Sequence, residues 1–177
     1  LIRGEGKKDK MILLNPGPVN VSERVRQALV RLDVCHRESE FTELLHGIQE
    51  KLLKLFVPGA EADYAAVVLT GSGTAAVESA VMSALPHGKR MLVLNNGVYG
   101  ERISQMVGLY RLGVSELKYD WTTRPDPERL RLALRQHPEA HAVAMVHHET
   151  TTGLINPVKE IADVVDSQNR VFILDAV

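Results

Sequence analysis

The segment of the sequence with the clearest chemical potential is Thr70-Gly71-Ser72-Gly73-Thr74. The apolar run Tyr64–Leu69 precedes it and the helix-favouring run Ala75–Leu85 follows it, which predicts a strand, a tight loop and a helix. Glycines allow the sharp turn, and the first N–H groups of the helix lie at its positive dipole end. With the hydroxyls of Ser72 and Thr74, the loop is suited to a phosphate or another small anion. The alternative is a glycine-rich turn in which Thr74 only caps the helix.

A carboxylate ends the last apolar run of the chain. Asp175 follows Val171–Leu174, and a buried carboxylate is costly unless a cation or hydrogen-bond donors compensate it. One interpretation is a hydrogen-bonded Asp at a strand end. The other is an Asp that keeps a ring nitrogen of a bound cofactor protonated. Pyridoxal phosphate would satisfy both this carboxylate and the anion loop.

Two further loops carry aromatic or hydroxyl side chains. Tyr99 lies between glycines, where it either packs or stacks on a cofactor ring. Thr150–Thr152 offer hydroxyls, either for helix capping or for a cofactor's phenolic oxygen. We do not expect the adjacent His147-His148-Glu149 to bind a metal, because neighbouring residues of an extended chain point to opposite sides.

The N-terminal part carries two other candidate groups. Asn15-Pro16-Gly17-Pro18 interrupts the strand-like run Met11–Leu14 with a fixed, non-helical loop. Ser22 is placed to cap a helix. Arg37 lies in the ionisable segment Cys35–Glu40. It either pairs with a neighbouring glutamate on the surface or binds an acidic substrate group through its fork of donors.

Alternating strands and helices must position these loops. Strands are predicted at 64–69, 91–94, 114–119, 142–146 and 171–174, with helices between them. This pattern indicates an α/β fold, a three-layer, mostly parallel sheet with helices on both faces. Ligands bind beyond the carboxyl ends of such strands, so the loops at Ser72, Asn95, Thr151 and Asp175 should meet in one crevice. We divide the chain into a linker or tag-like segment (1–10), an N-terminal arm with helices (11–60) and the large domain (61–177).

Composition excludes several classes of protein. The chain has 177 residues with 21 Lys and Arg against 22 Asp and Glu, a net charge of −1. This balance disfavours a partner such as nucleic acid or an anionic membrane. Cys35 is the single cysteine, so no internal disulfide forms and the reducing cytoplasm fits. No apolar run approaches the roughly 20 residues of a membrane span.

Taken together, these residues resemble the class V aminotransferases, pyridoxal 5'-phosphate enzymes of fold type I. The resemblance is strongest to the branch that acts on 2-aminoethylphosphonate and pyruvate. It extends from about Met11 to the end of the chain. The matching stretches are 14–19, 35–41, 69–78, 96–102, 147–153 and 174–176.

The resemblance implies a role for each candidate residue. Ser72, Gly73 and Thr74 would hold the cofactor phosphate, and Tyr99 would stack on the pyridine ring. Thr151, or a neighbouring threonine, would meet the phenolic oxygen, and Asp175 would pair with the pyridinium nitrogen. Asn15, Pro16 and Gly17 would line the substrate pocket, and Arg37 would contact the phosphonate.

The family's Schiff-base lysine has no counterpart here, because it would follow Asp175 by some tens of residues. The later substrate-binding arginine and the small C-terminal domain of the family are also missing. We therefore expect the chain to be the N-terminal part of an enzyme roughly twice as long, truncated and inactive alone. The complete enzyme would convert 2-aminoethylphosphonate and pyruvate to phosphonoacetaldehyde and alanine, as a homodimer with its sites at the interface.

Three alternatives stay open. The first is another class V enzyme, such as an alanine– or serine–glyoxylate aminotransferase. The second is a non-catalytic phosphate-binding module. The third is a nucleotide-binding α/β domain, which is disfavoured because neither the P-loop nor the dinucleotide fingerprint is present.

Overall fold

The computed structural model describes residues 12–176 and divides the chain into two compact units. The first is Leu1–Thr70, described from residue 12, and the second is Gly71–Val177, described to residue 176. The segment 1–10 lies outside the described residues. None of the helices within residues 12–176 combines the length and the apolarity that crossing a membrane requires.

The first unit is built from helices. Its elements are α1 (Glu23–Ala28), α2 (Ser39–Phe56) and the short 3-10 helix η1 (Glu61–Asp63). The predicted cap of α1 is confirmed, since Ser22 Oγ accepts a hydrogen bond from the Val25 N–H at 3.3 Å. The N-terminal arm was expected to contain helices, and α2 is the longer of the two α-helices found there among the described residues. A long-range hydrogen bond within this unit joins Gln49 Nε2 to the carbonyl oxygen of Ala66 at 2.8 Å.

Two strands predicted in the first unit are absent. Residues 12–14 and 64–70 form no regular secondary structure, and Met11 lies outside the described residues. Val67 and Leu69 are 77% and 80% exposed. A strand is stabilised by hydrogen bonds to a neighbouring strand. Residues 12–70 contain no strand with which these apolar runs could pair, so apolar composition alone did not make them strands.

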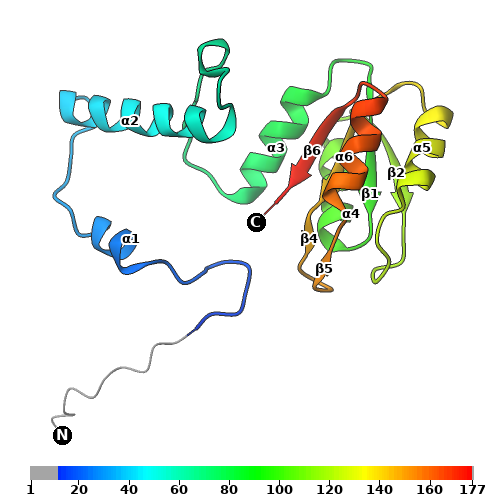
Figure 1. Cartoon of the computed structure of the whole chain (residues 1–177), viewed down its shortest axis with the longest axis horizontal. Coiled ribbons are helices and arrows are strands. Elements are labelled where there is room, and N and C mark those ends of the chain that lie inside the picture. Colours follow the sequence, from blue (N-terminus) through cyan, green and yellow to red (C-terminus); the bar gives the residue numbers. More distant parts are fainter. Residues whose placement is uncertain (1–11, 177) are drawn as a thin grey trace, which may run out of the picture. The chain divides into compact units, whose positions relative to one another are not determined.

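The second unit contains the predicted parallel sheet. Its strands are β1 (Arg90–Asn95), β2 (Gly113–Lys118), β3 (Ala140–Val146) and β6 (Val171–Asp175). They lie in the order β2-β1-β3-β6, and every pairing is parallel. Figure 1 shows the four strands with helices in front of and behind them. The α/β fold class with a mostly parallel sheet is therefore confirmed.

Four helices cover the two faces of this sheet: α3 (Gly73–Ala84), α4 (Val98–Leu109), α5 (Pro127–Gln136) and α6 (Val158–Ser167). Alternate residues of each strand point to opposite faces, which creates two apolar clusters. Leu92 and Leu94 of β1 pack with the helices α5 and α6. Met91 and Val93 pack with α3 and α4. Near-continuous apolar strands such as β1 and β3 are typical of parallel strands that are buried on both faces.

A small hairpin follows β3 and was not predicted. Residues 147–153 were expected to form a loop, but β4 (His148–Glu149) pairs antiparallel with β5 (Leu154–Ile155). The N–H groups of Thr152 and Gly153 both donate to the carbonyl oxygen of Glu149, at 3.1 and 2.9 Å. Gly153 has a φ of 76°, a conformation that glycine adopts without strain. Each strand has only two residues, which is too short for a periodic signal in the sequence.

The connections define where a ligand would bind. From β1 the chain passes through α4 to β2, which pairs with one edge of β1. It then returns through α5 to β3, which pairs with the opposite edge of β1. After β1 it joins α4, which packs on one face. After β3 it passes through the β4–β5 hairpin to α6 on the opposite face. The loops after β1 and β3 therefore diverge, and such a switch point is the usual ligand crevice of an open parallel sheet.

Candidate functional site

Glu149 connects the two loops that diverge at the switch point. Its side chain is 0% exposed. Its Oε2 accepts a hydrogen bond from the backbone N–H of Tyr99 at 3.2 Å, and its Oε1 accepts one from the hydroxyl of Thr151 at 2.6 Å. Tyr99 and Thr151, two of the predicted site residues, are thus tied to one carboxylate. Tyr99 is half-buried and packs against the apolar cluster under α3 and α4.

Asp175 lies at the carboxyl end of β6, next to the end of β3. Its backbone carbonyl accepts a hydrogen bond from the His147 N–H at 2.8 Å. Burial raises the pKa of the Asp175 carboxyl, the charge of Glu149 raises it further, and the positive charge of Arg102 offsets part of the rise. Within residues 12–176, the Asp175 carboxylate takes part in no hydrogen bond or ion pair. It is therefore a half-buried negative charge without a direct partner, so a cation would stabilise it.

The N-terminus of α3 supplies hydrogen-bond donors. Ser72 is the cap residue, and its Oγ accepts from the Ala75 N–H at 3.4 Å. In the alternative interpretation of this turn, the assignment of the cap to Thr74 is therefore wrong. The first N–H groups of a helix have no partner inside it, and Ser72, through its side chain and its carbonyl oxygen, satisfies those of Ala75 and Ala76. The N–H groups of Gly73 and Thr74 stay available to an anion.

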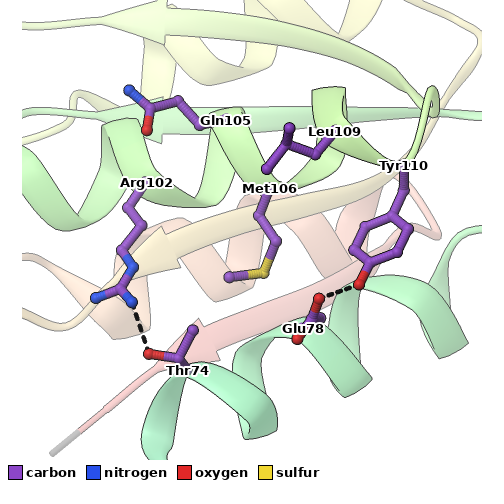
Figure 2. A pocket seen from close by; sticks show the side chains of 7 residues that line it. All are labelled: Thr74, Glu78, Arg102, Gln105, Met106, Leu109 and Tyr110. Atoms are coloured by element: carbon purple, nitrogen blue, oxygen red, sulfur yellow. Dashed lines mark hydrogen bonds between the residues drawn. The ribbon is translucent and has the colours of Figure 1, made fainter.

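A groove of about 480 Å³ lies between α3 and α4. Figure 2 shows Arg102 of α4 reaching Thr74 of α3 at one end, where Arg102 Nη2 donates to Thr74 Oγ1 at 2.7 Å. At the other end the Tyr110 hydroxyl donates to Glu78, a hydrogen bond that raises the pKa of Tyr110. The apolar side chain of Met106 lies between the two ends (Figure 2). The two hydrogen bonds join α3 to α4 at opposite ends of the groove.

A buried pair of asparagines connects the loops that follow β1 and β3. Asn96 and Asn156 are 1% and 2% exposed. Asn96 Nδ2 donates to Asn156 Oδ1 at 2.8 Å and to the carbonyl oxygen of Thr123 at 3.0 Å. Asn156 Nδ2 donates to the carbonyl oxygen of Val146 at 2.8 Å. The end of β3, the loop after β1 and the start of α6 are therefore held by one buried network.

The structure thus brings four predicted loops to one edge of the sheet. Thr74 is hydrogen-bonded to Arg102. Tyr99 and Thr151 are both hydrogen-bonded to Glu149. Asp175 interacts electrostatically with Arg102 and with Glu149. Ser72 and Gly73 directly precede Thr74 in the same turn. Sequence reasoning assigned no role to Glu149 except as a doubtful metal ligand, and it overlooked Arg102 and the asparagine pair. Glu149 follows a buried strand, and that position was the signal available.

The candidate substrate residues lie in the first unit. Asn15 Nδ2 donates to the carbonyl oxygen of Pro18 at 2.9 Å, which closes the loop that also contains Pro16 and Gly17. Arg37 is exposed, and none of the ion pairs within residues 12–176 includes it. The surface pairing with a neighbouring glutamate that the sequence allowed therefore does not occur.

The residues at the sheet edge fit pyridoxal 5'-phosphate. The α3 turn offers N–H groups and hydroxyls to a phosphate, as helix N-termini do. Asp175 offers an unpaired carboxylate to a protonated ring nitrogen. The donors and the carboxylate lie on neighbouring elements, since α3 packs against both α4 and β6. Pyridoxal phosphate carries a phosphate and a ring nitrogen that can be protonated. The α3 turn suits the phosphate, and the Asp175 carboxylate suits the protonated nitrogen.

Comparison with known proteins identifies the family. The model of the family described as Aminotransferase class-V matches residues 20–177. The chain is 42% identical over 165 residues to a 2-aminoethylphosphonate–pyruvate transaminase from Syntrophobacter fumaroxidans, an alignment that covers 93% of this chain and 44% of that protein. It is 36% identical over 170 residues to a protein of the same name from Vibrio vulnificus, covering 96% and 46%. The chain thus spans about half the length of the curated relatives it matches.

Solved structures show the same fold. A pyridoxamine–pyruvate aminotransferase from Mesorhizobium loti superimposes with a TM-score of 0.80 at 26% identity, covering 93% of this chain and 41% of that one. An alanine–glyoxylate aminotransferase from Nostoc sp. gives 0.78 at 28% identity, covering 98% and 45%. The family and its fold imply pyridoxal phosphate as the cofactor. By the family match, the fold and the arrangement of the sheet edge, this chain belongs to the class V aminotransferases.

Proposed function

We propose that this chain forms part of a pyridoxal-phosphate-dependent 2-aminoethylphosphonate–pyruvate aminotransferase. In that reaction the amino group of 2-aminoethylphosphonate passes to pyruvate, and phosphonoacetaldehyde and alanine are formed. The observation that carries the cofactor assignment is the unpaired Asp175 carboxylate at the carboxyl end of β6. The substrate assignment is supported by the relatives of that name, which share 34–42% identity with this chain.

Asp175 would act on the ring nitrogen. When bound, pyridoxal phosphate supplies a conjugated ring that accepts the electron pair left when a proton leaves the amine-bearing carbon. A carboxylate beside the ring nitrogen holds a proton on that nitrogen, and this makes the ring a better electron acceptor. Burial and the charge of Glu149 raise the pKa of Asp175, and a positive charge beside this carboxylate would stabilise its ionised form and lower that pKa.

The turn at Ser72, Gly73 and Thr74 would bind the phosphate. The free N–H groups of Gly73 and Thr74 and the positive end of the α3 dipole act together on an anion. Arg102 adds a positive charge next to Thr74. This arrangement orients the cofactor by its phosphate while Asp175 fixes the opposite polar group of the ring.

The phenolic oxygen of the cofactor would meet a threonine of the β4–β5 turn. Thr151 gives its hydroxyl proton to Glu149, and Thr152 gives its proton to the Glu149 carbonyl oxygen at 3.2 Å. A hydroxyl has one proton, so toward a ligand these two oxygens act as acceptors. Thr150 has no hydrogen bond from its hydroxyl within the described part of the chain, so it is the better donor. Tyr99 would contact the ring face.

Arg37 would bind the phosphonate group of the substrate. Its guanidinium has no ion-pair partner among the described residues, and a planar fork of donors matches a phosphonate as it matches a phosphate. Asn15, Pro16 and Gly17 would line the same pocket. We further propose that the lysine that carries the cofactor lies outside this chain, and that the complete enzyme is a homodimer.

The substrate proposal is tested with the complete protein that contains this chain. Purified protein is mixed with pyridoxal phosphate and with one of two substrate pairs, 2-aminoethylphosphonate with pyruvate or alanine with glyoxylate, and the alanine or glycine formed is measured. Alanine formation that depends on 2-aminoethylphosphonate supports the proposal. Formation of glycine from alanine and glyoxylate, with no use of the phosphonate, would instead favour an alanine–glyoxylate aminotransferase, a name carried by one of the similar solved structures.

A further inference from the structure

The N-terminus of α4 has no capping side chain of its own. Gly97 occupies the cap position and has no side chain to accept a hydrogen bond from the first turn. The N–H of Tyr99, in that first turn, instead donates to Glu149 Oε2. The carboxylate comes from β4, fifty positions further along the chain. Glu149 therefore does for α4 what an aspartate at the cap position does for an ordinary helix.

This position explains how a carboxylate without a counter-ion is accommodated in the interior. Glu149 is completely buried, and no ion pair within residues 12–176 includes it. Two hydrogen bonds, from Tyr99 and Thr151, replace part of its hydration. The positive end of the α4 dipole stabilises the negative charge. The hydrogen bonds and the helix dipole therefore offset part of the cost of burying the Glu149 carboxylate at the ligand crevice.

Gly97 is needed to make room for Glu149. A Cβ atom built on Gly97 would lie 2.4 Å from both Cγ and Cδ of Glu149 and 2.7 Å from its Oε2. These contacts are far closer than van der Waals packing allows. The side chain of Glu149 cannot move aside without breaking its two hydrogen bonds, because both of its oxygens are engaged. The glycine and the glutamate are therefore a matched pair.

We propose that Glu149 is a positioning residue of the cofactor site, which caps α4 from a distant strand and thereby sets the places of Tyr99 and Thr151 at the crevice. The inference deepens the proposed function and rests on it for the identity of the ligand. Glu149 touches no substrate in this scheme and acts through its two partners. Its buried carboxylate also holds the Thr151 hydroxyl in one orientation, with the oxygen lone pairs directed away from Glu149.

A merely structural role makes different predictions, so two properties are measured. The first is the hydrogen-exchange rate of the Tyr99 amide in cofactor-free protein. The second is the affinity for pyridoxal phosphate relative to inorganic phosphate. The variants are Glu149→Ala, which removes both acceptors, and Glu149→Gln, which keeps an acceptor for the Tyr99 N–H. Asp163→Asn is the control, because Asp163 is an exposed carboxylate of α6 that pairs with Lys159 and takes no part in the crevice.

In Glu149→Ala we expect faster exchange of the Tyr99 amide and a loss of affinity for pyridoxal phosphate, each by about tenfold. Affinity for inorganic phosphate should stay unchanged, because the α3 turn does not depend on Glu149. Glu149→Gln should restore the amide protection, and Asp163→Asn should alter neither property. Unchanged exchange in Glu149→Ala, or equal losses for both ligands, would overturn the inference. These measurements use the complete protein that contains this chain. If that protein without substitutions fails to bind pyridoxal phosphate, the proposed function fails, while the exchange rate still decides whether Glu149 caps α4.

Discussion

Arg102 Nη2 donates a hydrogen bond of 2.7 Å to Thr74 Oγ1 and so joins α4 to the first turn of α3. A guanidinium only donates hydrogen bonds. The Thr74 oxygen is therefore the acceptor in this pair, and its own proton stays free to be donated to an anion in front of the turn. Arg102 thus orients a hydroxyl at the predicted phosphate site and adds positive charge beside it.

Replacing Arg102 should weaken phosphate binding. Arg102→Met removes the charge and the hydrogen bond, and we expect the affinity for inorganic phosphate to fall about fivefold or more. Arg102→Lys should recover only part of the loss, because an ammonium lacks the planar fork. Titration calorimetry measures the affinities, and Arg135→Met, at an exposed arginine of α5, is the control. Equal affinities for Arg102→Met and Arg135→Met would show that Arg102 does not serve the phosphate site.

Replacing Asp175 by Asn should change how stability depends on pH. Burial and the charge of Glu149 raise the pKa of Asp175 in the folded state. The folded protein therefore binds this proton more tightly than the unfolded chain, and Asp175 makes the free energy of unfolding fall as pH rises from about 4 toward its folded pKa. Asp175→Asn lacks this effect, so in cofactor-free protein its stability relative to the original should increase with pH across that range.

Urea unfolding of both proteins at several pH values between 4 and 7 measures the difference. Curves that run parallel would contradict the raised pKa. The same variant should bind pyridoxal phosphate more weakly, since it lacks the carboxylate that we propose pairs with the ring nitrogen. A variant that is more stable without cofactor and binds the cofactor less well is the expected signature of a charge held in place for a ligand.

The sheet and its helices could be predicted from the sequence because their signals are local. The apolar runs at β1 and β3 and the Asp126–Pro127 start of α5 each carry their own pattern, and Asp126 Oδ1 does accept the Glu128 N–H at 3.1 Å. The run at residues 64–69 is also largely apolar but forms no strand. Strand formation depends on a neighbour, and periodicity along one segment does not report on neighbours.

The site was only partly predictable for a related reason. Thr74, Tyr99, Thr151 and Asp175 were found because they end predicted strands or begin helices. Glu149 was overlooked because its two important contacts are with residues distant in sequence. One is the hydrogen bond from the backbone N–H of Tyr99, and the other is its close packing against Gly97, where there is no Cβ atom. A backbone donor leaves no mark on residue type. The same holds for the carbonyl oxygens that Asn96 and Asn156 satisfy.

The three threonines of the β4–β5 turn should differ in their effect on the cofactor. Thr150→Val removes the hydroxyl whose proton is free, and Thr151→Val removes one whose proton is given to Glu149. Each variant is titrated with pyridoxal phosphate and with an analogue that lacks the phenolic oxygen. We expect Thr150→Val to abolish the difference in affinity between the two ligands and Thr151→Val to weaken both by a similar factor. The reverse pattern would assign the phenolic contact to Thr151.

The buried asparagine pair should contribute strongly to the stability of the site. Asn156→Leu is close in volume, but it leaves Asn96 and the carbonyl oxygen of Val146 without their buried partner. Unsatisfied buried groups of this kind cost about 1–3 kcal/mol each, so the free energy of unfolding should fall by about 2 kcal/mol or more. Gln136→Leu makes a comparable change at an exposed residue of α5 and should alter it by less than about 0.5 kcal/mol. Because Asn96 and Asn156 join the loops after β1 and β3, Asn156→Leu should also speed hydrogen exchange at Tyr99, whereas a loss of stability without that change would confine the pair to the core.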